Sequence, residues 1–337
     1  MIMRMILRAV KYIFLVFVVG FFVFLLLIQR VPRKTPRLYG VTFVPQAAEA
    51  LGLDWKEVYR ALFDDLGVRN VRISAYWDEI EKEKDSFDYS RLDFQVEEAQ
   101  RHGARIIFVI GRKVPRWPEC HIPKWAKDLT LEKQDNELFD YMGKVILRYK
   151  NFPAIVMWQV ENEPFLPFGE CPDFGAKSVD AGIALVRSLD GGRPILVTDS
   201  GELSIWIRAA RRGDIFGTTM YRTVWNKVVG ELTYPLPPSF FRFKRAITEL
   251  VVGQKQMIVI ELQGEPWLSR PLQETTIEEH YTVVNPEKFR GILEYAEASG
   301  FDTFYLWGVE WWYWLRANGH PEIWEIFKEK LKAVDHG

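Results

Sequence analysis

The sequence has few of the residues that hold metals or phosphates. Two cysteines and five histidines occur in 337 residues, and the histidines show no spacing typical of metal ligands. No calcium-loop pattern occurs, and no glycine-rich phosphate loop follows the first short apolar run. Low-complexity tracts and a composition shift that would mark a second domain are also missing. These absences indicate one large domain that works without a cofactor.

Acidic residues are absent from residues 1–37, which contain seven Lys or Arg. The rest of the chain has 37 basic against 45 acidic residues, a net charge of −8. Proteins that bind nucleic acid usually carry a basic patch or stripe. The main part of the chain is therefore not expected to have a nucleic-acid partner, and nothing in the sequence indicates an obligate protein partner.

A long uncharged run near the N-terminus, residues 12–29, consists almost entirely of Ile, Leu, Val and Phe. As a helix it would be about 27 Å long, close to the hydrocarbon thickness of a bilayer. A secretory signal is the alternative, but its apolar region usually has about 7–15 residues and ends in a small-residue cleavage site. This run ends in Ile-Gln-Arg-Val-Pro-Arg. We therefore expect an uncleaved transmembrane anchor at 12–29, between a basic segment (1–11) and a basic linker (30–37).

The rest of the chain, residues 38–337, alternates short apolar runs with amphipathic helical patterns. The expected strands are residues 38–43, 70–74, 104–110, 155–160, 194–198, 215–221, 257–261 and 303–307. The expected helices are residues 54–66, 91–102, 132–149, 178–189, 286–299 and 321–334. Eight apolar strands alternating with helices indicate a parallel sheet covered on both faces. The fold class expected is α/β, a (β/α)8 TIM barrel preceded by one transmembrane helix.

Two of the expected strands run into glutamates. The fourth leads into Glu161-Asn162-Glu163-Pro164, and the seventh ends at Glu261. A buried carboxylate is costly to desolvate unless it has a partner or a task. Active sites of such barrels lie at the carboxyl ends of the strands, and paired carboxylates there are suited to cleaving a glycosidic bond. Other strand ends supply Arg72, Trp77, Arg112, Tyr221 and Trp307.

In these motifs the chain resembles the retaining glycoside hydrolases of clan A, TIM barrels with catalytic glutamates on strands four and seven. The resemblance rests on residues 158–164 (Trp-Gln-Val-Glu-Asn-Glu-Pro), on residues 259–263 (Val-Ile-Glu-Leu-Gln), and on the loop and helix at residues 76–93. It covers roughly residues 38–334 and looks nearest to the family 5-like cellulase, mannanase and beta-glycosidase groups. One feature departs from many family 5 relatives: Thr219 stands where they have a histidine.

The resemblance implies a role for each site residue. Glu261 would be the nucleophile and Glu163 the acid and base of a double displacement that retains configuration. Asn162 would bind the sugar 2-hydroxyl, Arg72 and Tyr221 would hold Glu261 ionised, and Trp307 would form the floor under the sugar. Trp77 and Trp267 are further candidates for sugar contact, with packing as the alternative. Glu161 is a third carboxylate for which a substrate role stays open.

The location of the domain follows from its expected substrate. Three basic residues precede the apolar run and four follow it, so the positive-inside rule does not choose an orientation. Large domains cross membranes largely regardless of charge, and a polysaccharide substrate would lie outside. We therefore expect a single-pass membrane protein with a cytoplasmic N-terminus and an extracytoplasmic catalytic domain.

The two cysteines lie in loops expected to be neighbours on one barrel face. Cys120 follows the third strand and Cys171 the fourth, so a disulfide between them is geometrically reasonable in an oxidising compartment. Free thiols are the alternative.

Two other functions also stay open: a transglycosylase using the same covalent intermediate, and a catalytically silent carbohydrate-binding envelope protein. The sequence names neither the sugar nor the linkage.

Overall fold

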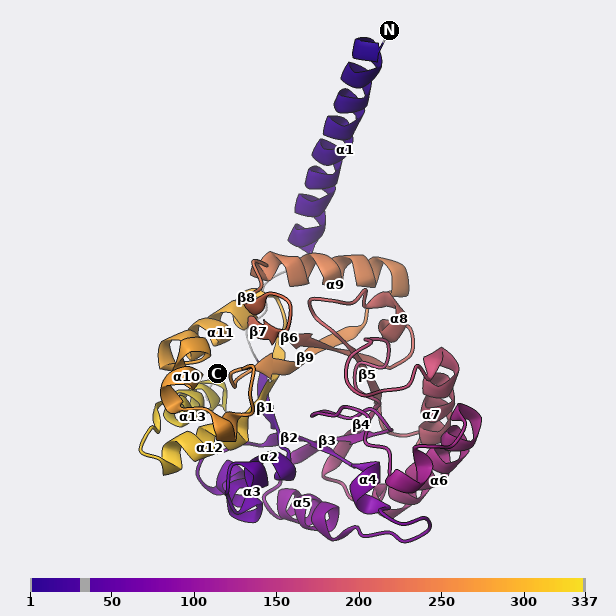
Figure 1. The fold of residues 1–337 in the computed structure, drawn as a ribbon, viewed down its shortest axis with the longest axis vertical. Coiled ribbons are helices and arrows are strands. Elements are labelled where there is room, and N and C mark those ends of the chain that lie inside the picture. The colour runs from indigo at the N-terminus through magenta and orange to yellow at the C-terminus, as the bar shows by residue number, and fades with distance from the viewer. Residues whose placement is uncertain (1, 31–36, 336–337) are drawn as a thin grey trace.

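The computed structural model describes residues 2–30 and 37–335, and its main body is a barrel (Figure 1). Within the described residues, the barrel strands are β1 (Leu38–Thr42), β2 (Asn70–Ser74), β3 (Arg105–Ile110), β4 (Ile155–Val160), β5 (Ile195–Asp199), β6 (Ile215–Met220), β9 (Gln256–Gln263) and β10 (Thr303–Trp307). Each strand pairs in parallel with the next, and β10 pairs with β1 to close the sheet. The predicted (β/α)8 barrel is confirmed.

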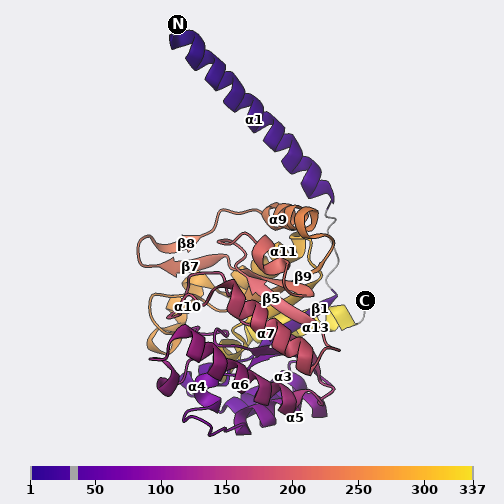
Figure 2. The same ribbon diagram turned by 90° about the vertical axis from the view of Figure 1, so that its right-hand side faces the viewer.

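Helices surround the barrel, as Figures 1 and 2 show. In the described chain, the helices that precede β5 are α1 (Ile2–Arg30), which projects from the barrel, followed by α2 (Pro45–Ala50), α3 (Trp55–Asp64), α4 (Trp77–Ile80), α5 (Ser90–Arg101), η1 (Lys124–Ala126), α6 (Leu131–Tyr149) and α7 (Gly175–Leu189). Those that follow β5 are α8 (Ile207–Ala210), α9 (Pro238–Val252), η2 (Leu272–Glu274), α10 (Ile277–Val283), α11 (Pro286–Ala298), α12 (Val309–Ala317) and α13 (Glu322–Asp335).

The segment after β6 differs from the sequence-based expectation. An antiparallel hairpin, β7 (Thr223–Asn226) with β8 (Gly230–Thr233), follows β6 directly. No helix was expected between residues 221 and 257, yet Pro238 begins α9 in this segment. A proline suits the first turn of a helix because the backbone N–H that it lacks would have no partner there. The prolines therefore mark the start of the helix between β6 and β9, which the sequence pattern missed.

The barrel interior is apolar at one end and polar at the other. Ile107, Leu196, Ile258 and Tyr305 pack together toward the amino ends of the strands. Toward the carboxyl ends, the buried side chains include Arg72, Gln159, Thr198 and Glu261. Burying these polar groups is tolerable only when they bond to one another. The apolar layer therefore supports a polar layer at the end of the barrel where active sites of this fold lie.

Helix α1 stands apart from the barrel (Figure 2). Its residues 10–27 form an apolar stretch that is long enough to cross a membrane and is not buried by the rest of the protein. A signal sequence of similar length would have the same properties. The contact between α1 and the barrel includes Phe24 and Phe243 of α9, whose ring centroids are 5.0 Å apart.

We predict that Asn285→Ala lowers the free energy of unfolding by about 1 kcal/mol. The Asn285 side chain accepts a hydrogen bond from the backbone N–H of Lys288 at 2.9 Å and so caps α11. Glu294→Ala, at an exposed position inside the same helix, is the control and should change stability by less than about 0.5 kcal/mol. Urea denaturation followed by circular dichroism measures both variants. Equal stabilities of the two variants would contradict the capping role.

Candidate active site

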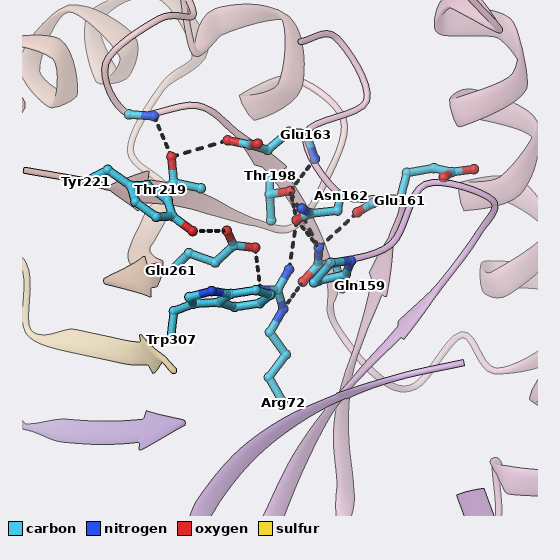
Figure 3. A network of polar contacts seen from close by, with 12 residues as sticks. Arg72, Gln159, Glu161, Asn162, Glu163, Thr198, Thr219, Tyr221, Glu261 and Trp307 are labelled. Atoms are coloured by element: carbon cyan, nitrogen blue, oxygen red, sulfur yellow. Dashed lines mark hydrogen bonds and ion pairs between the residues drawn. The ribbon is translucent and has the colours of Figure 1, made fainter. Parts of the chain in front are cut away.

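Glu261 lies near the carboxyl end of β9 with its carboxylate held from two sides (Figure 3). Arg72 Nη1 donates to Oε1 at 2.7 Å, and the Tyr221 hydroxyl donates to Oε2 at 3.2 Å. Burial and the adjacent carboxylates raise the pKa of Tyr221 well above its usual value, so the phenol keeps its proton and remains a donor. These two hydrogen bonds hold both carboxylate oxygens of Glu261 in place.

A β-bulge sets the direction of the Glu261 side chain. Along β6, Thr218 pairs with Val259, but the next residue pairs with Glu261, so β9 has one extra residue there. The pairing with β10 is interrupted at the same place. A bulge breaks the in-out alternation of a strand and re-aims the following side chain. Simple alternation would have placed Glu261 and Ile260 on opposite faces, yet Ile260 packs in the barrel interior and Glu261 bonds with Arg72.

Arg72, on β2, connects three strands through one buried guanidinium group. Nε donates to Gln159 Oε1 at 2.9 Å, Nη1 to Glu261 at 2.7 Å, and Nη2 to Asn162 Oδ1 at 2.8 Å. The planar guanidinium holds these acceptors in fixed directions, which an ammonium group would not do. Arg72 therefore sets the position of Asn162 relative to Glu261.

The side-chain amide of Asn162 is oriented by its neighbours. Its oxygen accepts from Arg72, from Gln159 Nε2 at 3.2 Å and from the Thr198 hydroxyl at 3.2 Å. With three donors around the oxygen, the amide NH2 must point the other way. The structure thus presents Asn162 to the site as a hydrogen-bond donor.

Glu163 lies one residue further along the chain, in the left-handed region with φ 44°. Its backbone N–H donates to the Thr198 hydroxyl at 2.8 Å, and its Oε1 accepts from the Thr219 hydroxyl at 3.2 Å. Burial, followed by the charges of Glu261 and Glu119, raises the pKa of Glu163 well above the usual value of a carboxyl group. Glu163 therefore holds its proton at a pH at which an exposed glutamate would have lost it.

Glu161 is turned away from the other two glutamates of this region. Its carboxylate accepts from the backbone N–H of Arg112 at 3.2 Å and of Lys113 at 2.6 Å, and its φ is 58°. Burial raises its pKa to about 7. Lys113 Nζ in turn donates to the carbonyl oxygens of Glu163 and Leu166. These bonds make Glu161 a link between the loops after β3 and β4.

Glu119, in the loop after β3, is a third carboxyl group in the site that the sequence did not indicate. It is nine-tenths buried, and its Oε2 has no hydrogen-bond partner among the described residues. Burial and the charge of Glu261 raise its pKa to about 8, while a hydrogen bond with Asn162 acts in the opposite direction. No strand pattern marks a residue nine positions beyond β3, so only the folded loop reveals it.

The loop of Glu119 is tied to its surroundings by covalent and close contacts. Cys120 and Cys171 form a disulfide in the structure, with Cα atoms 5.2 Å apart. Gly169 has a φ of 88°, and a Cβ atom there would lie 2.5 Å from Glu119 Cβ. A side chain at position 169 would push the two loops apart. The loops after β3 and β4 therefore form one unit beside Glu163.

Trp307, at the end of β10, belongs to a buried ionic group. Its Nε1 donates to Glu265 Oε1 at 2.8 Å, and the guanidinium of Arg116 lies over its ring, 4.5 Å from the centroid. Arg116 also forms an ion pair of 2.5 Å with Glu265. These contacts fix the plane of the indole, and one ring face is covered by Arg116. Any sugar contact would use the opposite face.

Trp267 is half-buried in the loop after β9. Its ring centroid is 5.5 Å from that of Tyr221 and 5.7 Å from that of Phe168, both in edge-to-face arrangements. Trp117, at the end of this series, is largely exposed and contacts Phe168. The structure thus places Trp267 in an aromatic row that begins at Tyr221, next to Glu261.

Trp77 needs a correction. It was a candidate for sugar contact with packing as the alternative, and packing is what the structure shows. Trp77 is fully buried, donates to Glu81 Oε2 at 2.8 Å and packs on Trp125 and Tyr141. It begins α4 and so faces the surrounding helices. Arg112 likewise turns outward to Gln134 on α6 and Ser178 on α7. Neither residue belongs to the site.

The polar residues above form one connected network, and the sequence pattern missed several of its members. Gln159, Thr198 and Thr219 are uncharged strand residues whose importance appears only when their partners are placed. Among the described residues, no group of three or more His, Cys, Asp or Glu is arranged to hold a metal ion.

A closed barrel with two glutamates near the carboxyl ends of its strands is the arrangement expected of a TIM-barrel glycoside hydrolase. Residues 61–229 match the family described as "Glycosyl hydrolases family 2, TIM barrel domain". The match covers half of the chain, and the chain belongs to this family. It includes Arg72, Glu163 and Tyr221 and ends before Glu261. The resemblance to clan A is confirmed, and the family whose model matches is family 2.

The individual relatives have low sequence identity to this chain. The chain is 26% identical over 137 residues to beta-galactosidase LacZ of Heyndrickxia coagulans, an alignment that covers 35% of this chain and 20% of that protein. A similar fold occurs in a beta-galactosidase from Halorubrum lacusprofundi, with a TM-score of 0.56, 16% identity and coverage of 80% of this chain and 52% of that one. The chain thus spans about half or less of these relatives.

Two other solved structures share the fold. An exo-beta-1,4-mannosidase from Opitutaceae bacterium strain TAV5 has a TM-score of 0.60 and 16% identity, covering 89% of this chain and 59% of that one. An endo-beta-1,4-xylanase of family 10 from Gloeophyllum trabeum has a TM-score of 0.54 and 17% identity, covering 82% and 87%. At these identities the likeness concerns the fold alone.

We predict that replacing both cysteines by serine lowers the free energy of unfolding by about 4 kcal/mol in the chain-entropy account of cross-links. The two residues are 51 positions apart, and the bond restricts this loop in the unfolded chain. Urea denaturation with and without a reductant is the measurement. Reductant should destabilise the natural protein and leave the double variant unchanged. Two reactive thiols in the native protein would contradict the disulfide.

Proposed function

We propose that the protein is a retaining beta-glycoside hydrolase that acts on oligo- or polysaccharides, with Glu261 as nucleophile and Glu163 as acid and base. The observation that carries this is the pairing of Glu261 with Arg72 at 2.7 Å and with Tyr221 at 3.2 Å, while Glu163 is kept protonated. A carboxylate held by a cation and a neighbouring carboxyl group that keeps its proton are suited to opposite tasks.

In the first step, the Glu261 carboxylate attacks the anomeric carbon as the glycosidic bond breaks, and Glu163 donates its proton to the departing oxygen. The products are a glycosyl ester on Glu261 and a free alcohol. In the second step, Glu163 accepts a proton from water, and the resulting oxygen nucleophile displaces Glu261. A separation of about 5–5.5 Å between the two carboxyl groups is expected for this route.

The other residues of the site support these steps. The NH2 group of Asn162 is oriented to donate to a sugar 2-hydroxyl, because its oxygen is occupied by three donors. Arg72 places a positive charge against one oxygen of Glu261, and the Tyr221 hydroxyl donates to the other oxygen. The free face of Trp307 serves as the floor under the reacting sugar, and Trp267 provides an aromatic edge further out.

We also infer the arrangement of the whole chain. Residues 12–29, within α1, are a membrane anchor between the basic segment 1–11 and the linker 30–37, and residues 38–337 form the catalytic domain outside the cytoplasm. The unburied apolar stretch of α1 supports the anchor. The disulfide supports an oxidising compartment, because such bonds are rare in the cytosol.

We predict that Glu261→Gln abolishes turnover of aryl beta-glycosides, because an amide cannot form the glycosyl ester. Glu163→Gln should lower kcat about 10²–10⁴-fold for substrates with poor leaving groups, which depend on the acid. The panel comprises aryl beta-galactoside, mannoside, glucoside and xyloside. Azide should restore turnover of Glu163→Ala with beta-configured glycosyl azide as product. Full activity in Glu261→Gln would exclude the assignment, and no turnover by the natural protein on any glycoside would favour a silent carbohydrate-binding protein.

We predict that Glu119→Gln moves the basic limb of kcat/KM to lower pH. The first step needs protonated Glu163, so activity falls as the pH rises through its raised pKa. The charge of Glu119 contributes to that raised value, and without it Glu163 ionises more easily. The pH profile of the natural protein and of the variant on one aryl glycoside tests this. Gln134→Glu changes a residue outside the site, on α6, and an equal shift in both variants would contradict the local effect.

A further inference from the structure

The outer face of α9 is apolar where a barrel helix normally meets water. Phe243, Ile247, Leu250 and Val251 recur at positions i, i+4, i+7 and i+8 and therefore lie along one stripe. Leu250 is 68% exposed and Val251 is 44% exposed. The opposite face, with Phe241, packs against the barrel. Helix α9 thus has apolar side chains on both faces, and the outer ones need an explanation.

The neighbouring loop after β5 extends this apolar area. Leu203 and Ile205 are largely exposed, the latter by 78%. Lys244 of α9 holds the loop in place, since its Nζ donates to the carbonyl oxygens of Gly201 at 2.5 Å and Ser204 at 2.7 Å. We refer to Leu203, Ile205, Phe243, Ile247, Leu250 and Val251 together as the α9 surface. Single exposed apolar residues are ordinary, but a group on adjacent elements usually marks a contact site.

The position of α1 identifies what covers the α9 surface. Phe24, in the part of α1 that is apolar enough to span a membrane, contacts Phe243 of the α9 surface. In both overall views, α9 lies at the end of the barrel from which α1 extends (Figures 1 and 2). The eight peptide steps from Arg30 to Leu38 can span at most about 29 Å. The α9 side of the barrel is therefore held close to any bilayer that contains α1.

The composition of α9 agrees with a place at a lipid surface. Residues 238–252 contain three basic residues and one acidic residue. A helix that lies in the plane of a membrane combines an apolar stripe, buried among the acyl chains, with basic residues that attract anionic headgroups. The α9 surface supplies such an apolar stripe, and it lies beside the helix that could span a membrane.

We propose that the α9 surface rests in the interfacial layer of the bilayer that holds α1. This inference builds on the proposed membrane anchoring and adds an orientation to it. The flank of the barrel that carries α8 and α9 faces the lipid, so the carboxyl ends of the strands open sideways along the membrane. The catalytic glutamates then meet glycans close to the lipid surface.

The test uses the full chain in vesicles of phosphatidylcholine and phosphatidylglycerol. A photoreactive amino acid is placed singly at Leu250, at Ile205, at Val16 of α1, and at Leu147 as a matched exposed leucine on α6, which lies on another side of the barrel. Irradiation followed by mass spectrometry counts lipid adducts. Leu250 and Ile205 should give on the order of tenfold more lipid adduct than Leu147, as expected for side chains inserted below the headgroups.

Each of the other outcomes contradicts either the lipid contact of the α9 surface or the membrane anchor itself. Lipid adducts at Val16 with none at Leu250 or Ile205 would overturn the inference and leave the anchor in place. No adducts at Val16, Leu250 or Ile205 would overturn the anchor and the inference with it. Crosslinks from Leu250 to a second copy of the chain would make the α9 surface a dimer interface and contradict the lipid contact. Hydrolysis of a soluble aryl glycoside by each labelled protein verifies that the barrel is folded.

Discussion

The buried guanidinium of Arg72 is the interaction on which the rest of the site depends. One planar group donates to Gln159 on β4, to Asn162 just after β4 and to Glu261 on β9. A cation with no exposed surface is tolerable only while its partners stay in place, since a buried charge without partners costs several kcal/mol. Arg72 therefore links the position of Glu261 to the orientation of Asn162, and removing one of these partners would disturb the other.

Because of this arrangement, Glu261 and Glu163 have different surroundings. The Glu261 carboxylate accepts from a cation and a phenol, whereas the Glu163 carboxyl group accepts from the Thr219 hydroxyl and lies near other carboxyl groups. If two carboxyl groups were merely close together, they would share one proton and neither group would hold it preferentially. The surroundings decide which one keeps it, and this division of roles is what a double displacement needs.

The sequence predicted the barrel because eight apolar runs and their helices repeat regularly, and residues 155–160 and 303–307 match β4 and β10. It also found the charged and aromatic residues at the strand ends. Uncharged partners such as Thr198, and loop residues such as Glu119, carry no periodic signal. Trp77 looked like a site residue because it follows a strand, but the first turn of α4 rotates it into the core. The bulge that re-aims Glu261 depends on pairing with β6, which a single strand does not reveal.

The central claim is that Glu261 forms the covalent intermediate while Arg72 and Tyr221 hold it. The most direct measurement is trapping with an activated 2-fluoro glycoside, followed by intact mass and peptide mapping. The proposal predicts one glycosyl group per protein, bound as an ester to Glu261, and no label in Glu261→Gln. A label on Glu163, Glu119 or any other residue would contradict it.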